Sequence, residues 1–281
     1  KFFEPLQLKV FEHLPAEQIN TRIQESFVPR ALPGPQSLTR PAGTLPPAQC
    51  LRALRQKVFG GWPEEPPAAQ PVLTDTQKLN GLRHDTYLLP IQPGIVLPLH
   101  VLRASSLRRP KGILLSILDQ AQWTNGLAQS LFTGSGLAGN SAQFQAQLRS
   151  GRQALAFFAP RGIDPAGWPQ KPVLATQVRR RFMLLGQTLD GMRVWDVRCA
   201  VRALGALPGL NRAPITLQAE GQMGINSAYA ALFEPGIRRL ELSHLPRSHT
   251  EGPDYLNVLE LWAIPQMLQA VRQRAELQVR T

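Results

Sequence analysis

Four short apolar runs, separated by longer stretches with helical periodicity, recur from residue 112 onward in this 281-residue chain. The runs lie at residues 112–119, 154–162, 214–221 and 238–245. Runs of this length and composition are typical of strands that are covered on both faces. Strands that alternate with helices connect by right-handed crossovers, so the pattern predicts an α/β fold with a mostly parallel central sheet between helices.

Residues 87–92 and 95–103 favour an antiparallel hairpin ahead of these runs, and residues 275–281 favour a final strand. The longest periodic stretch predicts one amphipathic helix packed on the sheet. Its apolar residues recur at three- and four-residue steps, at Phe182, Leu185, Leu189, Met192, Trp195 and Cys199. Further helices are expected at 141–149, 223–233 and 255–274, the last with a break at Pro265.

Proline dominates the beginning of the chain. Ten of the 26 prolines fall within residues 29–71, and each lacks the backbone N–H that a helix or a central strand needs. We therefore expect residues 1–70 to form an extended proline-rich N-terminal arm, with a short helix near residues 51–58. Residues 71–281 are expected to form the α/β domain.

Composition and motif spacing exclude several classes of protein. The net charge is +12, but the basic side chains are scattered and no nucleic-acid-binding motif occurs, so a nucleic-acid partner is not expected. No apolar stretch is long enough to span a membrane. Two cysteines and five histidines without ligand spacing predict no metal site. The G-x-G-x-x-G match at residues 134–139 follows no strand, so no cofactor is expected.

Several ordered segments resemble the acetyl-xylan-esterase-like branch of the α/β-hydrolases, especially the second half of tandem proteins of that branch. The segments are FFAPRG (157–162), RRRFMLLGQTLDGMRVWDVRCAVRAL (179–204), ITLQAEGQMG with YAALFEPGI (215–237) and PDYLNVLELWAIPQMLQAV (253–271). The resemblance covers the chain from residue 87 onward. It implies a three-layer α/β-hydrolase sandwich, a carbohydrate ligand, an upstream catalytic domain as partner, and a secreted or periplasmic location.

The resemblance also implies where a nucleophile belongs. In such esterases it occupies a G-x-S-x-G elbow after the fifth strand. This chain contains no G-x-S-x-G, and the matching turn places Gly221 at the nucleophile's position and Gln222 after it. A glycine offers neither a hydroxyl nor a thiol for an acyl-enzyme. The family's acid follows the seventh strand and its base histidine the eighth, whereas this chain ends on what we interpret as the seventh.

A displaced catalytic constellation is an alternative. Ser227 would be the hydroxyl, His249 the base and Asp254 the acid that orients it, because an acid after strand six is a known placement in this fold. The run around His249 also fits a turn followed by a helix that begins near Pro253, with Thr250 or Gly252 as its cap.

The loop after the run at 112–119 would supply an oxyanion-hole N–H in a hydrolase. This loop contains Gln120, Ala121 and Trp123. Trp123 either stacks on a sugar ring in a cleft or anchors the loop in the core.

Three functional hypotheses remain. The first is a degenerate, carbohydrate-esterase-like domain that acts as structural or accessory partner of an active esterase domain. The second is an active carboxylic-ester hydrolase on acetylated sugars with an atypical catalytic constellation. The third is a polyanion-binding module, which the net charge of +12 would serve.

Overall fold

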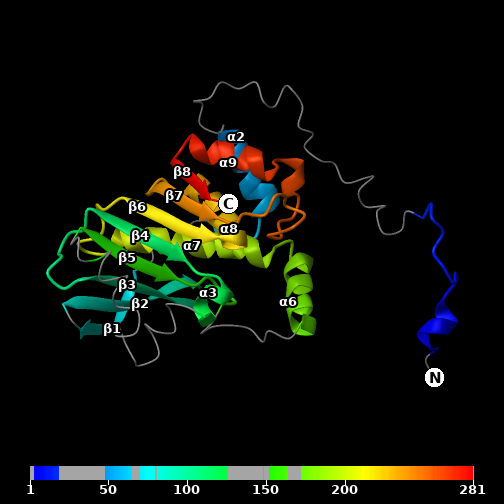
Figure 1. Cartoon of the computed structure of the whole chain (residues 1–281), viewed down its shortest axis with the longest axis horizontal. Helices are drawn as coiled ribbons and strands as arrows, with labels where there is room; N and C mark the ends of the chain where they lie inside the picture. The colour runs from blue at the N-terminus through cyan, green and yellow to red at the C-terminus, as the bar shows by residue number, and fades with distance from the viewer. Residues whose placement is uncertain are drawn as a thin grey trace.

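A single sheet of eight strands organises the described part of the molecule, in the order β1-β2-β3-β5-β4-β6-β7-β8 (Figure 1). The computed structural model describes residues 3–18, 48–64, 70–79, 81–125, 148, 152–163 and 172–280. None of the helices in these ranges is long and apolar enough to cross a membrane.

The sheet joins an antiparallel end to a parallel end. An antiparallel meander is formed by β1 (Val72–Leu79), β2 (Leu82–Gln92) and β3 (Ile95–Ala104). β3 pairs antiparallel with β5 (Gln153–Phe158). Parallel pairing then runs from β5 through β4 (Gly112–Ile117), β6 (Ile215–Glu220), β7 (Ile237–Ser243) and β8 (Glu276–Arg280). The four apolar runs are therefore parallel neighbours in one sheet, which confirms the predicted fold class.

Strand β1 is the element that the sequence did not predict. Residues 72–78 are all exposed, so the edge strand carries no buried alternation. Its register with β2 is set instead by backbone pairing, from Val72 opposite Leu88 to Leu79 opposite Leu82.

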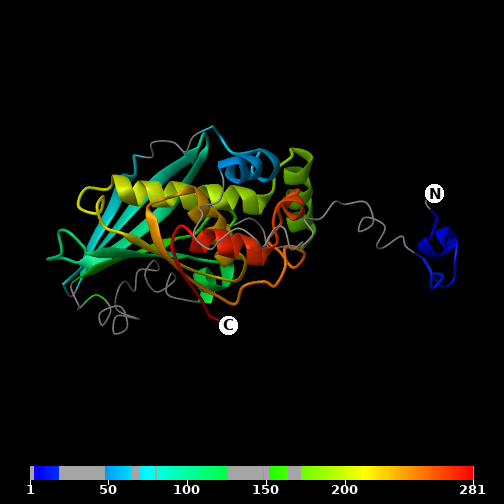
Figure 2. The same ribbon diagram turned by 90° about the horizontal axis from the view of Figure 1, so that it is seen from above.

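Most helices cover one face of the sheet (Figure 2). They are α2 (Ala48–Ala53), α7 (Leu189–Ala206), α8 (Gly221–Phe233) and α9 (Ile264–Arg272). The larger hydrophobic cluster lies between these helices and the sheet, where Ile113, Leu115 and Ile117 of β4 pack with Trp195 and Tyr229. Alternate residues of each strand therefore point into one continuous core.

The opposite face is divided between apolar and polar halves. Over β2, β3 and β5 a second hydrophobic cluster forms from Leu82, Leu102, Leu118, Leu148, Leu155 and Phe157. Helix α3 (Gln120–Asn125) contributes Trp123 to it. Over β6 to β8 the outward side chains are polar, and Arg239 contacts Glu241, Glu276 and Gln278 there. The parallel end of the sheet therefore has one face that is polar among the described residues.

The expected single helix from Phe182 to Cys199 is two helices, so that prediction is wrong. α6 (Pro172–Leu184) is followed by a turn at Gly186, whose φ is +67°, and the N–H of Gln187 donates to Phe182 O at 3.0 Å. Thr188 then caps α7, its Oγ1 accepting from Gly191 N at 2.9 Å. Because the break rotates the two faces apart, Leu185 lies 73% exposed instead of packing on the sheet.

Part of the proline-rich region belongs to the core. Helix α2 continues into the π-helical turn η2 (Leu54–Val58), which matches the expected short helix. Phe59 stacks on Trp62 with ring centroids 4.2 Å apart, and the Trp62 indole N–H donates to Gly191 O at 2.7 Å. Arg198 places its guanidinium 4.7 Å from the Trp62 ring centroid. These contacts fix residues 48–62 against α7.

Two local predictions near the C-terminus are wrong. Pro265 does not break a helix but lies in the first turn of α9, where its missing N–H needs no partner. No helix begins at Pro253, because residues 253–257 form a loop and turn ahead of the short 3₁₀ helix η4 (Val258–Glu260). Of the helix expected at 141–149 only residue 148 is described, and the glycines at 134–139 lie outside the described residues.

Stability measurements can check the core assignment on α7. Leu204 is fully buried, so Leu204→Ala is expected to lower the free energy of unfolding by about 2–5 kcal/mol through lost contacts and a residual cavity. The matched control Leu185→Ala, at the exposed break, should change it by less than about 0.5 kcal/mol. Urea titrations of both variants provide the comparison, and equal losses would contradict the assigned packing.

Candidate functional site

The loops that follow the parallel strands meet at one edge of the sheet, around a cavity of about 300 Å³. Its walls come from the segments after β4, β5 and β6 and from α7. The described lining residues are Asp119, Gln120, Ala121, Gly162, Ile163, Arg193, Gln222 and Met223. The cavity therefore lies where open α/β sheets place their ligands.

The turn between β6 and α8 has the geometry of a sharp elbow. Gly221 has a φ of +53°, a left-handed conformation that favours glycine. Among the described residues, a Cβ built on Gly221 would come within 4 Å of the backbone oxygen of His244 alone, at 4.0 Å. The elbow therefore has space for a side chain at the position where the sequence supplies none.

Two other glycines bring the neighbouring segments close to this elbow. A Cβ on Gly224 would lie 2.4 Å from Leu245 Cδ2, so a larger residue there would require the Leu245 side chain to move. A Cβ on Gly252 would lie 2.7 Å from the Gln222 side-chain amide, at a φ of +109°. The Gln222 side chain is thus held against the loop after β7 and beside the cavity.

A buried ion pair supports the cavity wall from behind. The Arg161 guanidinium donates to both carboxylate oxygens of Asp196 on α7, with Nη2 to Oδ1 at 2.6 Å. The backbone N–H of Arg161 donates to the same carboxylate at 2.9 Å. Both side chains are buried, so the carboxylate and the guanidinium each replace lost water with charged partners.

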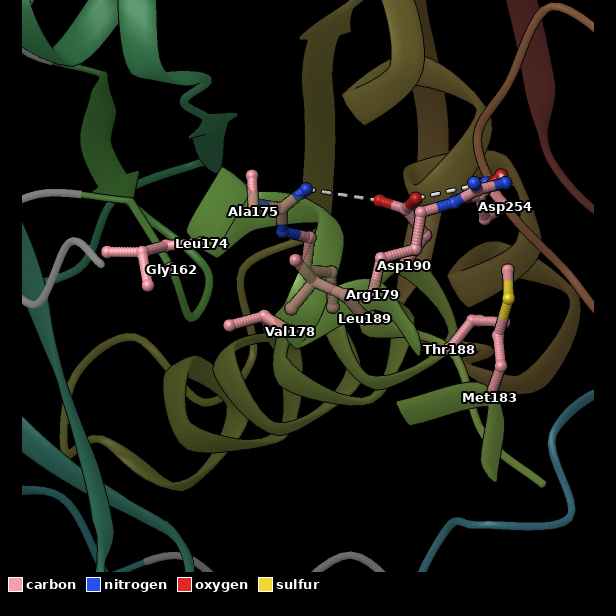
Figure 3. Close-up of a pocket in the computed structure, with 11 residues that line it drawn as sticks. Gly162, Leu174, Ala175, Val178, Arg179, Met183, Thr188, Leu189, Asp190 and Asp254 are labelled. Atoms are coloured by element: carbon pink, nitrogen blue, oxygen red, sulfur yellow. Dashed lines mark hydrogen bonds and ion pairs between the residues drawn. The ribbon is translucent and has the colours of Figure 1, made fainter. Parts of the chain in front are cut away.

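A second ionic network continues from this pair along the surface of the cavity. Arg193 donates through Nε to Arg161 O at 3.1 Å and through Nη1 to Asp190 Oδ1 at 3.1 Å. The other Asp190 oxygen accepts from the backbone N–H of Asp254 at 3.0 Å. Asp254 in turn pairs with Arg179 of α6, with Nη2 to Oδ1 at 3.0 Å. Figure 3 shows these carboxylates beside a second, adjoining cavity.

The structure places the three residues of the displaced constellation in different surroundings. Ser227 is fully buried within α8, and its Oγ has no hydrogen-bond partner in the described part of the chain. His249 hydrogen-bonds through Nε2 to the Tyr229 hydroxyl at 3.0 Å. Asp254 pairs with Arg179. Each of the three thus has surroundings of its own, and no hydrogen bond links one to another among the described residues.

The segment after β4 that was expected to be a loop forms the short helix α3, because Gln122 N donates to the Asp119 carboxylate at 2.7 Å and Trp123 N donates to Asp119 O at 2.9 Å. Gln120 and Ala121 line the cavity above the elbow, together with Gln222. Trp123 packs against both hydrophobic clusters, with its ring centroid 6.5 Å from that of His100. Trp123 therefore has the surroundings of a loop anchor, one of its two proposed roles.

Sequence reasoning named Asp254 but missed the other charged residues of the site. Arg161 and Asp196 are 35 positions apart, and neither belongs to a recognisable motif. Asp190 and Arg193 stand three apart on α7, which was a usable signal for an ion pair on a helix surface. The described residues include no group of three or more His, Cys, Asp or Glu that could hold a metal ion.

Comparison with known proteins identifies the fold. No family model and no curated protein matches the sequence. A solved structure from Bacteroides fragilis, described as an acetyl xylan esterase, matches with a TM-score of 0.63 at 13% identity. The match covers 82% of this chain and 66%, just under two thirds, of that one. Glucuronoyl esterase from Solibacter usitatus gives a TM-score of 0.56 at 12% identity, over 82% and 72% of the two chains.

Acetyl Xylan Esterase 1 from Thermoanaerobacterium matches with a TM-score of 0.51 at 11% identity, over 88% of this chain and 90% of that one. The chain has the α/β-hydrolase fold. At identities this low, structural similarity establishes only the arrangement of strands and helices. The chemistry of this chain has to be argued from the residues of its site.

The buried His249 should make stability depend on pH. Burial lowers the pKa of His249 from 6.5 to about 4. As the pH falls, His249 of the unfolded chain is protonated at a higher pH than His249 of the folded chain. The contribution to stability is therefore full above pH 6.5 and is lost between pH 6.5 and 4. A shift of this size corresponds to about 3 kcal/mol at most. His249→Gln should reduce that loss in urea titrations, whereas the exposed His13→Gln should leave it unchanged.

The Arg161–Asp196 pair can be tested by comparing the stability of a single variant with that of a double variant. Asp196→Asn leaves a buried guanidinium without its counterion, and we expect a loss of about 3–5 kcal/mol. The double variant Arg161→Met, Asp196→Leu removes both charges and should be more stable than Asp196→Asn. A double variant less stable than the single one would contradict this account of the pair.

Proposed function

We propose that this chain is a degenerate α/β-hydrolase domain of the carbohydrate-esterase-like kind, without a nucleophile at its elbow. The observation that carries the proposal is Gly221, which combines an elbow geometry and open space with the absence of a side chain. Acyl transfer by this fold requires a hydroxyl or thiol at that point, within reach of a base. The cavity above the elbow then serves binding or association with a partner instead of ester hydrolysis.

We further propose that the domain acts as a structural or accessory partner of an active esterase domain upstream in the same polypeptide. The similarity to carbohydrate esterases supports an acetylated carbohydrate as the material on which the complete protein works. In the full-length protein, removal of residues 71–281 should lower the yield or melting temperature of the esterase domain. Unchanged yield, stability and activity after that removal would contradict the accessory role.

Absence of acyl-enzyme chemistry is the direct prediction. The wild-type chain should not be labelled by a fluorophosphonate probe, because the elbow has no activated oxygen. Intact-mass spectrometry provides the measurement, and an active serine hydrolase serves as positive control. Labelling that is lost in Ser227→Ala and His249→Ala would overturn the proposal and favour an active hydrolase with the displaced constellation.

A cysteine introduced at the elbow tests its geometry. Gly221→Cys should fold at a cost of about 1–2 kcal/mol for its left-handed backbone conformation. In a Cys50→Ser background its thiol should react with iodoacetamide, because the space around Gly221 is open. The remaining Cys199 is buried, which raises its pKa to about 12, and should stay unmodified. A folded variant with an unreactive Cys at position 221 would show that the elbow is closed.

A further inference from the structure

A second cavity, of about 410 Å³, adjoins the one above the elbow and is larger. Gly162 and Arg193 line both cavities, so the two are neighbours along the same edge of the sheet. The second cavity lies between α6, the start of α7 and the loop after β7 (Figure 3). Its volume is within the range of sites for small molecules.

Two kinds of side chain form the walls. The apolar lining residues come from α6 and the first turn of α7, and they are Leu174, Ala175, Val178, Met183 and Leu189. The charged lining residues form the Arg193–Asp190 and Arg179–Asp254 ion pairs. Figure 3 shows Leu174 and Val178 apart from Asp190 and Asp254 across the cavity. A ligand with an apolar body and one polar end matches this division.

Among the described residues that line the cavity, the charges cancel. Its described lining contains two guanidinium groups and two carboxylates, and each guanidinium is already paired with a carboxylate. A charged ligand would give up its hydration without gaining an unpaired counterion, which is unfavourable in a largely apolar site. The cavity therefore favours an uncharged ligand.

Asp190 retains capacity to accept one more hydrogen bond. Its Oδ1 accepts from Arg193 and from the Asn226 side-chain amide, at 3.1 and 3.4 Å. Among the described residues its Oδ2 accepts only from Asp254 N. A carboxylate oxygen has two lone pairs, so Oδ2 can accept a further hydrogen bond, from the hydroxyl group of a ligand in the cavity. A hydroxyl is thus the polar end that fits.

We propose that this cavity binds an uncharged small molecule with an apolar body and a hydroxyl group at one end. The apolar body lies against Val178 and Leu174 of α6, and the hydroxyl donates to Asp190. The inference does not depend on whether the elbow is inactive, because no residue of the elbow lines this cavity in the described structure.

Four ligands of one shape and different polarity test the proposal by isothermal titration calorimetry. They are 2-naphthalenemethanol, 2-methylnaphthalene, the 2-naphthoate anion and the 2-naphthylmethylammonium cation. The alcohol should bind with a dissociation constant at least about tenfold lower than either ion, which is the effect of about 1.4 kcal/mol of unfavourable desolvation. It should also bind more tightly than 2-methylnaphthalene, which lacks the hydroxyl.

Two tryptophan substitutions on α6 locate the binding. Val178→Trp places a large side chain in the cavity and should abolish binding of 2-naphthalenemethanol. Gln177→Trp, on the exposed side of the same helix, is the matched control and should bind as the wild type does. Circular dichroism of both variants verifies folding. Equal affinity for the ions, binding that survives Val178→Trp in a folded variant, or no binding of the alcohol would each overturn the proposal.

Discussion

The buried pair of Arg161 and Asp196 is the contact on which the geometry of both cavities depends. It ties the end of β5 to the middle of α7 through three donors of one residue and a single carboxylate. Gly162 and Ile163 follow Arg161 directly in the chain, and Arg193 donates to the Arg161 carbonyl oxygen. Together with the packing of Ile163 in the larger hydrophobic cluster, the ion pair fixes where the cavity wall lies relative to the elbow.

The alternation of strands and helices was readable from the sequence wherever burial on both sides of a strand or on one side of a helix left a pattern. The runs that became β4, β5, β6 and β7 are of this kind. The pattern failed where local backbone chemistry overrode it. At Gly186 a left-handed residue ends α6 although apolar residues continue at helical spacing, so periodicity alone joined two helices. β1 left no pattern, because its side chains are exposed.

Some residues of the candidate site could likewise be predicted from the sequence, and others could not. Gly221, Gln222, Gln120 and Ala121 could be placed from sequence, since the order of elements decides which loops meet at the edge of the sheet. The ionic network could not be predicted from the sequence. Arg161 pairs with Asp196, and Asp254 with Arg179, only after segments distant in sequence have packed together. Partners of a buried charge are fixed by tertiary structure and leave no local signal.

The contact between Trp62 and Gly191 has a consequence for how the chain reaches this structure. The two residues are 129 positions apart, so residues 48–62 can dock only after α7 exists. During synthesis at 5–20 residues per second, Phe59 and Trp62 precede their partner by roughly 6–26 s. For that interval Phe59 and Trp62 lack the α7 and α8 residues against which they pack in the folded chain. Closure of this face of the core is therefore a late, long-range step that waits for the C-terminal half of the domain.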